Sequence, residues 1–231
     1  MDEKPQPSMM PVAVAIVFAG ALIAFSLYYV LRPAEPTSLI PDAERIQFRE
    51  VTDADHILGN PAAPIKIIEY SDLDCQFCRI FHATMKQIML EYGKTGEVAW
   101  VYRHFPIVEL HPNAPRLAEA SECVAELGGN DAFWKFIDTV FTTSNGGRFD
   151  MERLDATAAT AGVTVTAFRE CYDSRRHQAK VAADFDDATK AGGVGTPHNI
   201  IVSPVSPPIP VPGAQPYSTI QSIISTLLAG N

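Results

Sequence analysis

Hydrophobic and polar positions change their spacing several times in the middle of the chain. The run "PIKIIEY" (64–70) is almost continuously apolar, which is typical of a strand buried on both faces. Apolar residues then recur every three or four positions in "CQFCRIFHATMKQIMLEYG" (75–93), which predicts a helix that ends near Gly93. The alternation in "EVAWVYRHF" (97–105) predicts a second strand.

Residues 113–192 carry helical patterns instead. Their breaks lie at "GGN", "SNGGRF" and "GVT", and the last stretch (165–192) is predicted to be one helix. Beyond it, "TPHNIIV" (196–202) predicts a strand and "YSTIQSIISTLL" (217–228) a closing helix. Between them, the Pro-rich "SPVSPPIPVPG" (203–213) predicts an edge segment protected from further pairing. Two β-containing halves separated by helices predict an α/β domain with a helical insertion.

An uncharged apolar stretch lies near the N-terminus. No charged residue occurs from Met9 to Leu31, and "PVAVAIVFAGALIAFSLYYVL" occupies residues 11–31. A helix of that length spans roughly 31 Å, which matches the hydrocarbon core of a bilayer. A cleaved signal peptide usually has a shorter apolar region and a small-residue cleavage site. An uncleaved transmembrane anchor is therefore the favoured interpretation, and a cleaved signal is the alternative.

These patterns divide the chain into four parts. A short N-terminal tail (1–10) precedes the anchor, and a Pro-containing tether and loop (32–60) follow it. The α/β domain occupies residues 61–231, with its helical insertion at about 107–192. Positive charges on the two sides of the anchor are too evenly balanced to predict its orientation.

Composition allows one domain and argues against a nucleic-acid partner. The chain has 231 residues, of which 47% are hydrophobic, and this is enough to build a full core. Its formal net charge is -9, from 18 basic and 27 acidic residues, and the basic residues form no cluster in the sequence. We therefore expect an acidic, solvated surface and no nucleic-acid partner.

All four cysteines lie beyond the apolar stretch. An even number of cysteines after an export-type segment indicates an oxidising compartment. Four cysteines allow three pairings. Cys75 and Cys78 are near neighbours, which leaves Cys123 with Cys171.

The motif "CQFC" begins the first predicted helix of the domain. Cys75 lies in the first turn, where unpaired N–H groups and the helix dipole favour a thiolate, and Asp74 is the candidate N-cap. We expect Cys75 to attack disulfides and Cys78, one turn later, to resolve them. One alternative is an inert local disulfide, although so short a loop stabilises little. Another is a zinc site, which usually needs a second cysteine pair.

Several motifs resemble, in the same order, those of the DsbA-like thiol–disulfide oxidoreductases, above all the membrane-anchored bacterial branch that resembles BdbD. The resemblance covers residues 55–228. It implies an α/β thioredoxin fold with an inserted helical subdomain, and the single N-terminal transmembrane helix predicted above precedes this fold. The motifs are "DHILGNPAAPIKIIEYSDLDCQFCRIFH", "YRHFPIVELHPNAPRLAEASEC", "AFWKFIDTVF", "AFRECYDS", "GVGTPHNIIV" and "GAQPYSTIQSII".

The resemblance also implies how a client protein binds. "GTP" supplies a cis-proline, Pro197, that faces the cysteine pair, and the backbone of Thr196 pairs with a bound substrate segment. Gln76 and Phe77, between the two cysteines, complete the predicted substrate-binding residues.

Glu69 matches a family position, a buried acid six residues before the first cysteine. Such a carboxylate takes or gives a proton when Cys78 reacts. The alternative is a carboxylate at the strand end that pairs with a basic residue or reaches water.

In part of the family branch the other two cysteines form a structural disulfide. For Cys123 and Cys171 this implies closure of a loop of about 49 residues, which contributes on the order of 4 kcal/mol in the chain-entropy model. A second redox pair that relays electrons is the alternative, but neither cysteine lies in a C-x-x-C motif.

Some departures from the family pattern concern the redox potential. Strongly oxidising members have a proline and a histidine between the cysteines, where this chain has Gln76 and Phe77. Phe77 cannot donate a hydrogen bond and Asp74 adds negative charge, so a weaker oxidant is expected. His198, after the predicted cis-proline, is a candidate to tune the thiolate, although packing is the expected role of both His198 and His82.

The sequence therefore predicts a monomeric, membrane-anchored thiol–disulfide oxidoreductase that introduces disulfides into exported proteins. Its catalytic domain is expected in the periplasm or on the extracellular side of a single-pass anchor. The expected partners are reduced or unfolded exported proteins. The resemblance adds a quinone-linked reoxidising enzyme of the DsbB or vitamin K epoxide reductase type. The cysteine chemistry needs no metal and no organic cofactor.

Two other functions are alternatives. A reductase or isomerase uses the same cysteines with electrons flowing the other way, although no dimerisation domain is evident in the sequence. A non-catalytic thioredoxin-like metallochaperone holds copper between the thiols. The cis-proline motif argues against a metallochaperone, because that proline admits a peptide strand and keeps metal away.

Overall fold

The computed structural model describes residue 25 and residues 46–144, 146 and 148–230. The chain divides into two units, Met1–Arg45 and Ile46–Asn231. The predicted tail and, apart from Phe25, the predicted anchor lie outside the described residues. Across the described part of the chain, no helix combines the length and the apolar character needed to cross a membrane.

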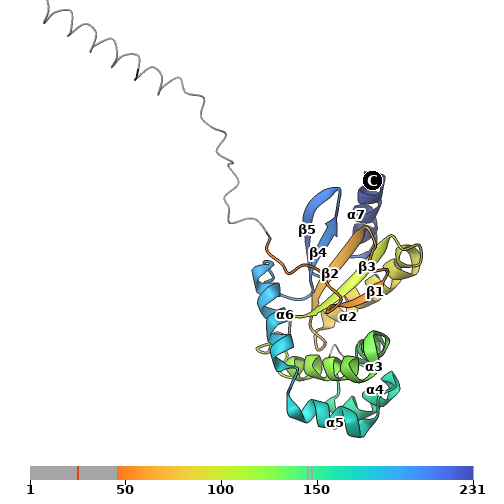
Figure 1. Ribbon diagram of the computed structural model, residues 1–231, viewed down its shortest axis with the longest axis vertical. Helices are drawn as coiled ribbons and strands as arrows, with labels where there is room; N and C mark the ends of the chain where they lie inside the picture. The colour runs from red at the N-terminus through yellow and green to blue at the C-terminus, as the bar shows by residue number, and fades with distance from the viewer. Residues whose placement is uncertain (1–24, 26–45, 145, 147, 231) are drawn as a thin grey trace, which may run out of the picture. The chain divides into compact units, whose positions relative to one another are not determined.

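A mixed five-stranded sheet forms the centre of the second unit (Figure 1). The strand order is β1-β3-β2-β4-β5. β2 and β3 are parallel and are connected through α2, while the remaining neighbours pair antiparallel. The strands are β1 His56–Gly59, β2 Ile65–Ser71, β3 Val98–His104, β4 His198–Ser203 and β5 Ser206–Pro212.

Helices flank the sheet and build the insertion between β3 and β4. α2 and α7 belong to the sheet-containing half, and the segments from α3 to α6 form the insertion. The helical segments are α2 Gln76–Ile88, η2 Met89–Gly93, α3 Ala114–Thr143, η3 Met151–Arg153, α4 Leu154–Ala161, α5 Val165–Ser174, α6 Gln178–Lys190 and α7 Tyr217–Ala229.

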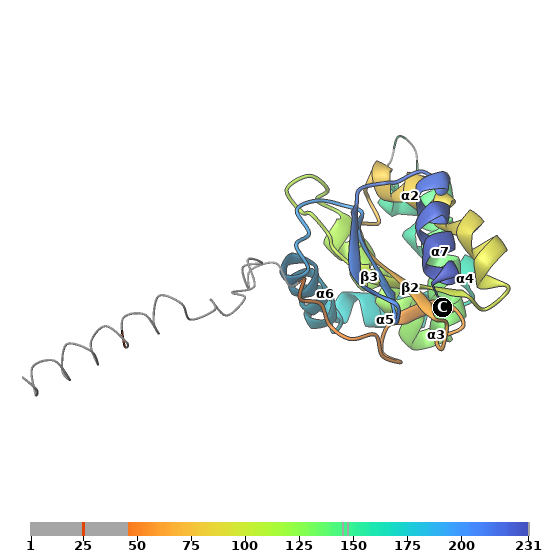
Figure 2. The same ribbon diagram turned by 90° about the horizontal axis from the view of Figure 1, so that it is seen from above.

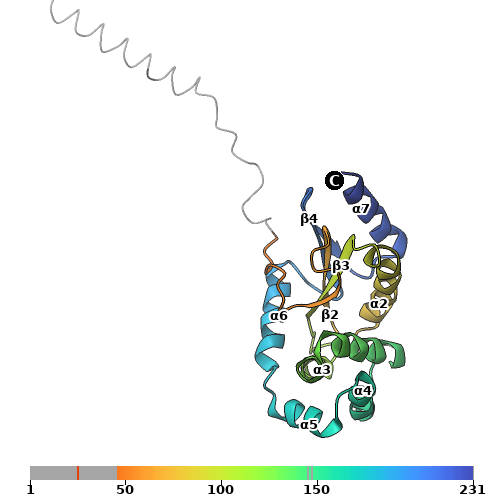
Figure 3. The ribbon, with the colours of Figure 1, turned by 45° about the vertical axis from the view of Figure 1, so that its right-hand side comes forward.

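Each face of the sheet has its own core, because successive strand side chains point to opposite faces. Ile65 and Ile67 of β2 belong to the larger core, with residues of α2, α3 and α7. Ile68 and Tyr70 belong to the smaller core, with Ala188 of α6. Figure 3 shows α6 on one side of the sheet and α2 with α7 on the other, while α3, α4 and α5 lie together at one end. The view from above in Figure 2 likewise has α6 on one side of the strands and α2 with α7 on the other.

The strands and helices occur in the predicted order, with one addition. β2 is the central strand and is buried on both faces, as its apolar run predicted. β1 (His56–Gly59) was not predicted, since residues 32–60 were expected to be tether and loop. It exists because it pairs with β3 along its whole length, from His56 opposite Tyr102 to Gly59 opposite Ala99. A four-residue strand held by such pairing has too short a pattern to detect in the sequence.

Two helix boundaries in the insertion differ from the prediction. The break predicted at "GGN" is a kink within α3, where Gly129 alone has non-helical angles (φ 77°). The single helix predicted over 165–192 is two helices, α5 and α6. They separate at Arg175, whose left-handed backbone (φ 58°) ends α5 and whose guanidinium binds the buried carboxylate of Glu119. A tertiary contact therefore sets this boundary.

A buried arginine fastens the N-terminal segment and α6 to the sheet. Arg103 of β3 is fully buried. Its guanidinium donates to Asp55 (Nε–Oδ1 2.8 Å) and to Asp187 of α6 (Nη1–Oδ2 2.8 Å). It also donates to the carbonyl oxygens of Arg49 and Glu50. These bonds satisfy the charge that burial would otherwise make costly.

Replacing this arginine should destabilise the domain strongly. Arg103→Met removes the buried guanidinium that pairs with both Asp55 and Asp187, and leaves these carboxylates with only their bonds to Arg49, Thr52 and Tyr70. We expect a loss of about 3–5 kcal/mol in the free energy of unfolding. The matched control is Arg176→Met, which removes an exposed ion pair with Glu126 and should cost far less. Chemical denaturation of the two variants measures both losses. Similar losses would contradict the anchoring role of Arg103.

Candidate active site

Cys75 and Cys78 lie at the junction between β2 and α2. The chain leaves β2 through a turn in which the N–H of Cys75 donates to the carbonyl oxygen of Asp72 at 3.1 Å. Cys75 itself takes the N-cap position of α2 with extended backbone angles, and the helix begins at Gln76. The first sulfur is therefore next to the unpaired N–H groups of the first turn.

The expectation that Asp74 caps α2 is wrong. No side chain caps this helix, and the Asp74 carboxylate accepts from the backbone N–H of Phe149 at 2.8 Å. The turn buries Asp74 and points its side chain toward the insertion rather than toward the helix N-terminus. Burial raises the pKa of this carboxyl group. Asp74 therefore connects the active-site turn to the helical insertion.

Cys75 is the more acidic thiol. Its pKa is lowered to about 5, chiefly because the Cys78 thiol donates a hydrogen bond to the thiolate. The backbone N–H groups of Cys78 and Phe77 add to the effect, while burial of the sulfur opposes it. The thiolate is thus stabilised without a histidine between the cysteines.

Cys78 has the opposite properties. It is fully buried, and its pKa is raised well above the ordinary value, first by burial and then by the neighbouring Cys75. The N–H of Asp72 donates to its Sγ at 3.3 Å. Near neutral pH the pair therefore holds one charged and one neutral sulfur, as an attacking and a resolving thiol require.

Glu69 lies on β2, on the sheet face that carries α2. It is fully buried, and its Oε2 accepts from Nε1 of Trp100 at 2.9 Å. Burial raises its pKa to about 7. Ser71 and Trp100, as hydrogen-bond partners of the carboxylate, oppose this rise in pKa. Burial, and then the charges of Glu69 and Cys78, raise the pKa of Tyr102, so these groups form one buried polar cluster.

Thr196 and Pro197 lie opposite Cys75. The peptide bond between them is cis, and the carbonyl oxygen of Thr196 lies 3.7 Å from Sγ of Cys75. The carbonyl oxygen of Pro197 accepts from the N–H of Gly213 at 2.8 Å, which holds this segment against the start of the last loop. Of the two residues between the cysteines, Gln76 is exposed and Phe77 is 53% exposed.

The two candidate histidines do not contact either sulfur in the structure. His82 is buried on α2, bonds Asp138 through Nε2 at 3.0 Å and packs against Trp100. His198 is buried on β4 and bonds the carbonyl oxygen of Ala191 at 3.0 Å. Burial lowers the pKa of both imidazoles. Both positions are packing positions.

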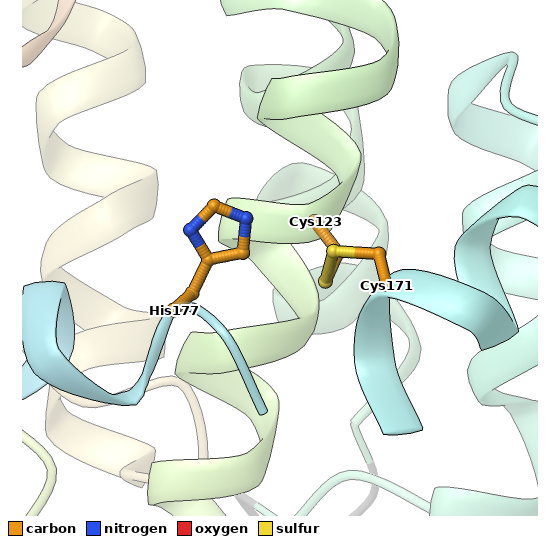
Figure 4. Close-up of side chains that lie close together, drawn as sticks. All are labelled: Cys123, Cys171 and His177. Atoms are coloured by element: carbon orange, nitrogen blue, oxygen red, sulfur yellow. A yellow bond between two sulfur atoms is a disulfide. The ribbon is translucent and has the colours of Figure 1, made fainter. Parts of the chain in front are cut away.

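The remaining cysteines form a disulfide inside the insertion. Cys123 of α3 and Cys171 of α5 are bonded, with 5.8 Å between their Cα atoms and a sequence separation of 48. Figure 4 shows this bond with His177 beside it. Both cysteines are buried, so the disulfide ties α3 to α5 away from solvent. In the described part of the chain, Cys75 and Cys78 are both free thiols and are not bonded to this pair.

A family model described as thioredoxin matches residues 51–205, which is more than half of the chain. The chain therefore belongs to the thioredoxin family. The solved structures that it resembles define a narrower class within this family. Wolbachia pipientis alpha-DsbA1 is 25% identical with a TM-score of 0.65, and the match covers 78% of this chain and 93% of that one. Pseudomonas aeruginosa DsbA2 is 25% identical with a TM-score of 0.61, and the match covers 77% and 97%.

BdbD from Bacillus subtilis has the same fold, with a TM-score of 0.70 and 20% identity over 80% of this chain and 99% of that one. With the cysteine pair at the β2–α2 junction, these matches define a DsbA-like thiol–disulfide oxidoreductase. The predicted fold, family and enzyme class are confirmed for the domain.

The curated relatives found by sequence are longer proteins. The Na(+)/H(+) antiporter NhaA 3 of Salinispora tropica is 33% identical over 150 residues, which are 63% of this chain and 21% of that protein. The Na(+)/H(+) antiporter NhaA 1 of Mycolicibacterium gilvum is 31% identical over 183 residues, which are 76% of this chain and 27% of that protein. The chain thus spans about a fifth to a quarter of these relatives, and antiporter activity is a property of theirs.

Sequence reasoning missed one feature of the site. It did not identify the hydroxyls of Ser71 and Tyr102, although both alternate with Glu69 and Trp100 on the same face of β2 and β3. The predicted stabilisation of the Cys75 thiolate by first-turn N–H groups comes from the backbone of Phe77 and Cys78. The position of the motif at a helix N-terminus was the signal for it.

The thiolate should be visible in a pH titration of the reduced protein. We expect alkylation of Cys75 to rise with a midpoint near pH 5, because the thiolate is the reactive form. Cys78→Ala removes the main hydrogen-bond donor and should move the midpoint upward, and Cys75→Ala should abolish the low-pH reaction. A wild-type midpoint between about 8 and 9, as in free thiols, would contradict the arrangement described here.

The same shift gives the reduced protein a pH-dependent stability. The pKa of Cys75 is lower in the folded protein than in the unfolded chain. Its contribution to the free energy of unfolding is therefore complete above the unfolded pKa of about 8.5. It is lost as the pH falls through the folded value of about 5. In chemical denaturation of the reduced protein, the free energy of unfolding contributed by Cys75 should rise between about pH 5 and about pH 8.5.

Proposed function

We propose that the protein is an oxidase of exported proteins, which donates its Cys75–Cys78 disulfide to reduced clients. The observation that carries the proposal is the contrast between the two thiols, a stabilised thiolate at Cys75 and a buried neutral thiol at Cys78. A stabilised thiolate favours the reduced enzyme, and an enzyme with a favoured reduced form gives its disulfide away.

The reaction follows from this contrast. A client thiolate attacks Sγ of Cys75 in the oxidised enzyme, a client–Cys75 disulfide forms, and the bond to Cys78 breaks. Cys78 leaves as a thiolate and takes up a proton. A second client thiolate then attacks the client sulfur, and Cys75 leaves with the electron pair. Cys75 is a good leaving group because its pKa is about 5. The client is oxidised by two electrons and the enzyme is reduced by two.

Exposed apolar side chains around Cys75 support an unfolded client. Phe77 lies two residues after Cys75 and Ile80 lies one turn further along α2, and both are about half exposed. Val194, two residues before Thr196, is 98% exposed. Unfolded segments expose apolar side chains that pair with such a surface.

A second loop extends this apolar surface. Val108 and Leu110 are exposed in the loop after β3. Asp72, in the active-site turn, holds that loop by accepting from the N–H of Ile107 at 2.9 Å and bonding Nδ1 of His111 at 2.9 Å. Because Asp72 also donates its own N–H to Cys78, the loop is fixed next to the cysteine pair.

We further propose that residues 11–31 anchor the protein in a membrane and that the domain lies on the extracytoplasmic side. The uncharged apolar stretch supports the anchor. The Cys123–Cys171 disulfide is typical of an oxidising compartment and supports the location. A quinone-linked membrane enzyme of the DsbB or vitamin K epoxide reductase type would then reoxidise the reduced pair.

Glu69 is proposed to exchange the proton of Cys78. Its buried carboxyl group has a pKa of about 7, so near neutral pH it can both take and give a proton. Its charge contributes to the raised pKa of Cys78, after burial and the neighbouring Cys75, so the two groups lie close enough to interact. The ion-pair alternative has no support, because no basic side chain of the described residues pairs with Glu69.

Glu69→Gln should slow the step in which Cys78 must lose its proton. The test uses the mixed disulfide between Cys75 and glutathione, in which Cys78 is a free thiol. Attack of Cys78 on the Cys75 sulfur should accelerate as the pH rises through about 7, because the Glu69 carboxylate accepts the Cys78 proton. The variant should lose this inflection and react about 100-fold more slowly at pH 8. Stopped-flow thiol release measures the rate, with Glu91→Gln, an exposed carboxylate on η2, as control. An unchanged inflection in Glu69→Gln would exclude the proton role.

Trapping of clients tests the function itself. When the full chain is expressed in bacteria, Cys78→Ser should accumulate reducible mixed disulfides between Cys75 and exported proteins, because Cys78 can no longer attack Cys75 and return the client as a free thiol. Cys75→Ser and the double variant should accumulate none. Equal trapping by Cys75→Ser would contradict the assigned roles, and trapping of cytoplasmic proteins alone would contradict the proposed compartment.

A further inference from the structure

Three buried side chains from separate elements meet on the sheet face that packs against the insertion. They are His56 of β1, His104 at the end of β3 and Glu122 of α3, whose side chains are 11%, 1% and 7% exposed. Nε2 of His56 and Nε2 of His104 each lie 2.9 Å from the same oxygen, Oε1 of Glu122. The function proposed above uses none of them.

Strand pairing and helix packing bring the three together. His56 lies opposite Tyr102 in the β1–β3 ladder, so His56, Tyr102 and His104 share one face of the sheet. α3 crosses that face, and Phe133, further along α3, stacks on the His56 ring with 3.6 Å between ring centroids. The stacking fixes the orientation of one imidazole toward Glu122.

The donor set matches a transition-metal site. The ligand atoms of the three side chains lie within 4.8 Å of one another. Two ligands that are each about 2.1 Å from a tetrahedral zinc ion are about 3.4 Å apart, so small side-chain shifts suffice to place an ion among them. Two imidazoles with one carboxylate are a common protein ligand set for zinc and leave a fourth position for water.

Solvent can reach this cluster. A surface cleft of about 350 Å³ is lined in part by His56, Asp53 and Ala125. One competing cation is present, since Nζ of Lys180 lies 3.5 Å from Oε1 of Glu122. Lys180 is partly exposed and has a closer partner in Asp184, at 2.6 Å, so it can leave Glu122 without losing its ion pair.

We propose that His56, His104 and Glu122 form a binding site for a divalent transition-metal ion of the zinc type. The ion joins β1, β3 and α3, and so clamps the helical insertion onto the sheet. This metal chemistry is independent of the thiol chemistry of Cys75 and Cys78.

Cobalt and zinc titrations of the full chain test the site. The protein is first treated with chelator, and its Cys75–Cys78 pair is kept oxidised so that no thiolate of that pair binds metal. We expect one equivalent of Co²⁺, detected by visible absorption, to bind and to be displaced by Zn²⁺. His56→Gln and His104→Gln keep an N–H donor for Glu122 and should lower the affinity at least tenfold. His177→Gln, which removes an imidazole bonded to the exposed Glu126, should bind as wild type.

Two outcomes would overturn the proposal. One is the absence of stoichiometric Co²⁺ or Zn²⁺ binding to the wild-type chain, and the other is wild-type affinity in a folded His104→Gln variant. If a variant does not fold, imidazole NMR signals of the wild-type chain decide. Zn²⁺ should shift the signals of His56 and His104 and leave that of His177 in place, and any other pattern contradicts the site.

Discussion

The stabilisation of one sulfur by the start of a helix is the interaction on which the site depends. Cys75 is the N-cap of α2, so the backbone N–H groups of the first turn and the thiol of Cys78 converge on its sulfur. This geometry exists because β2 ends one short turn before α2 begins. The charge of the Cys75 sulfur is therefore stabilised first by the Cys78 thiol and then by the backbone N–H groups of the first turn, and neither contribution depends on the side chains of Gln76 and Phe77.

The two faces of β2 carry side chains with different roles. Glu69 points to the face of α2, where burial raises its pKa to about 7 and places it near Cys78. Tyr70 points to the other face, where it donates to Asp187 at 2.6 Å within the ion-pair network of Arg103. One face thus holds the proton chemistry and the other holds the N-terminal segment and α6 in place. Alternation along a single central strand produces both.

Much of this arrangement could be read from the sequence. The apolar run of β2 and the helical spacing after Cys75 predicted the strand–helix junction, and the resemblance predicted the fold. The rest depends on contacts that local patterns do not contain. β1 forms because β3 offers it an edge, α5 ends because Glu119 binds Arg175, and Asp74 turns toward Phe149 instead of capping α2. The meeting of His56 with His104 and Glu122 likewise needs three elements folded together.

The central claim is that the stabilised thiolate makes the protein a donor of disulfides. The most direct measurement is the reduction potential of the Cys75–Cys78 pair in the full chain, by equilibration with glutathione of known ratio and quantification of free thiol. The account predicts a potential of about -120 to -180 mV, the range of enzymes that oxidise their clients. A potential near about -270 mV would make the reduced form unfavoured, and the protein would then act as a reductant.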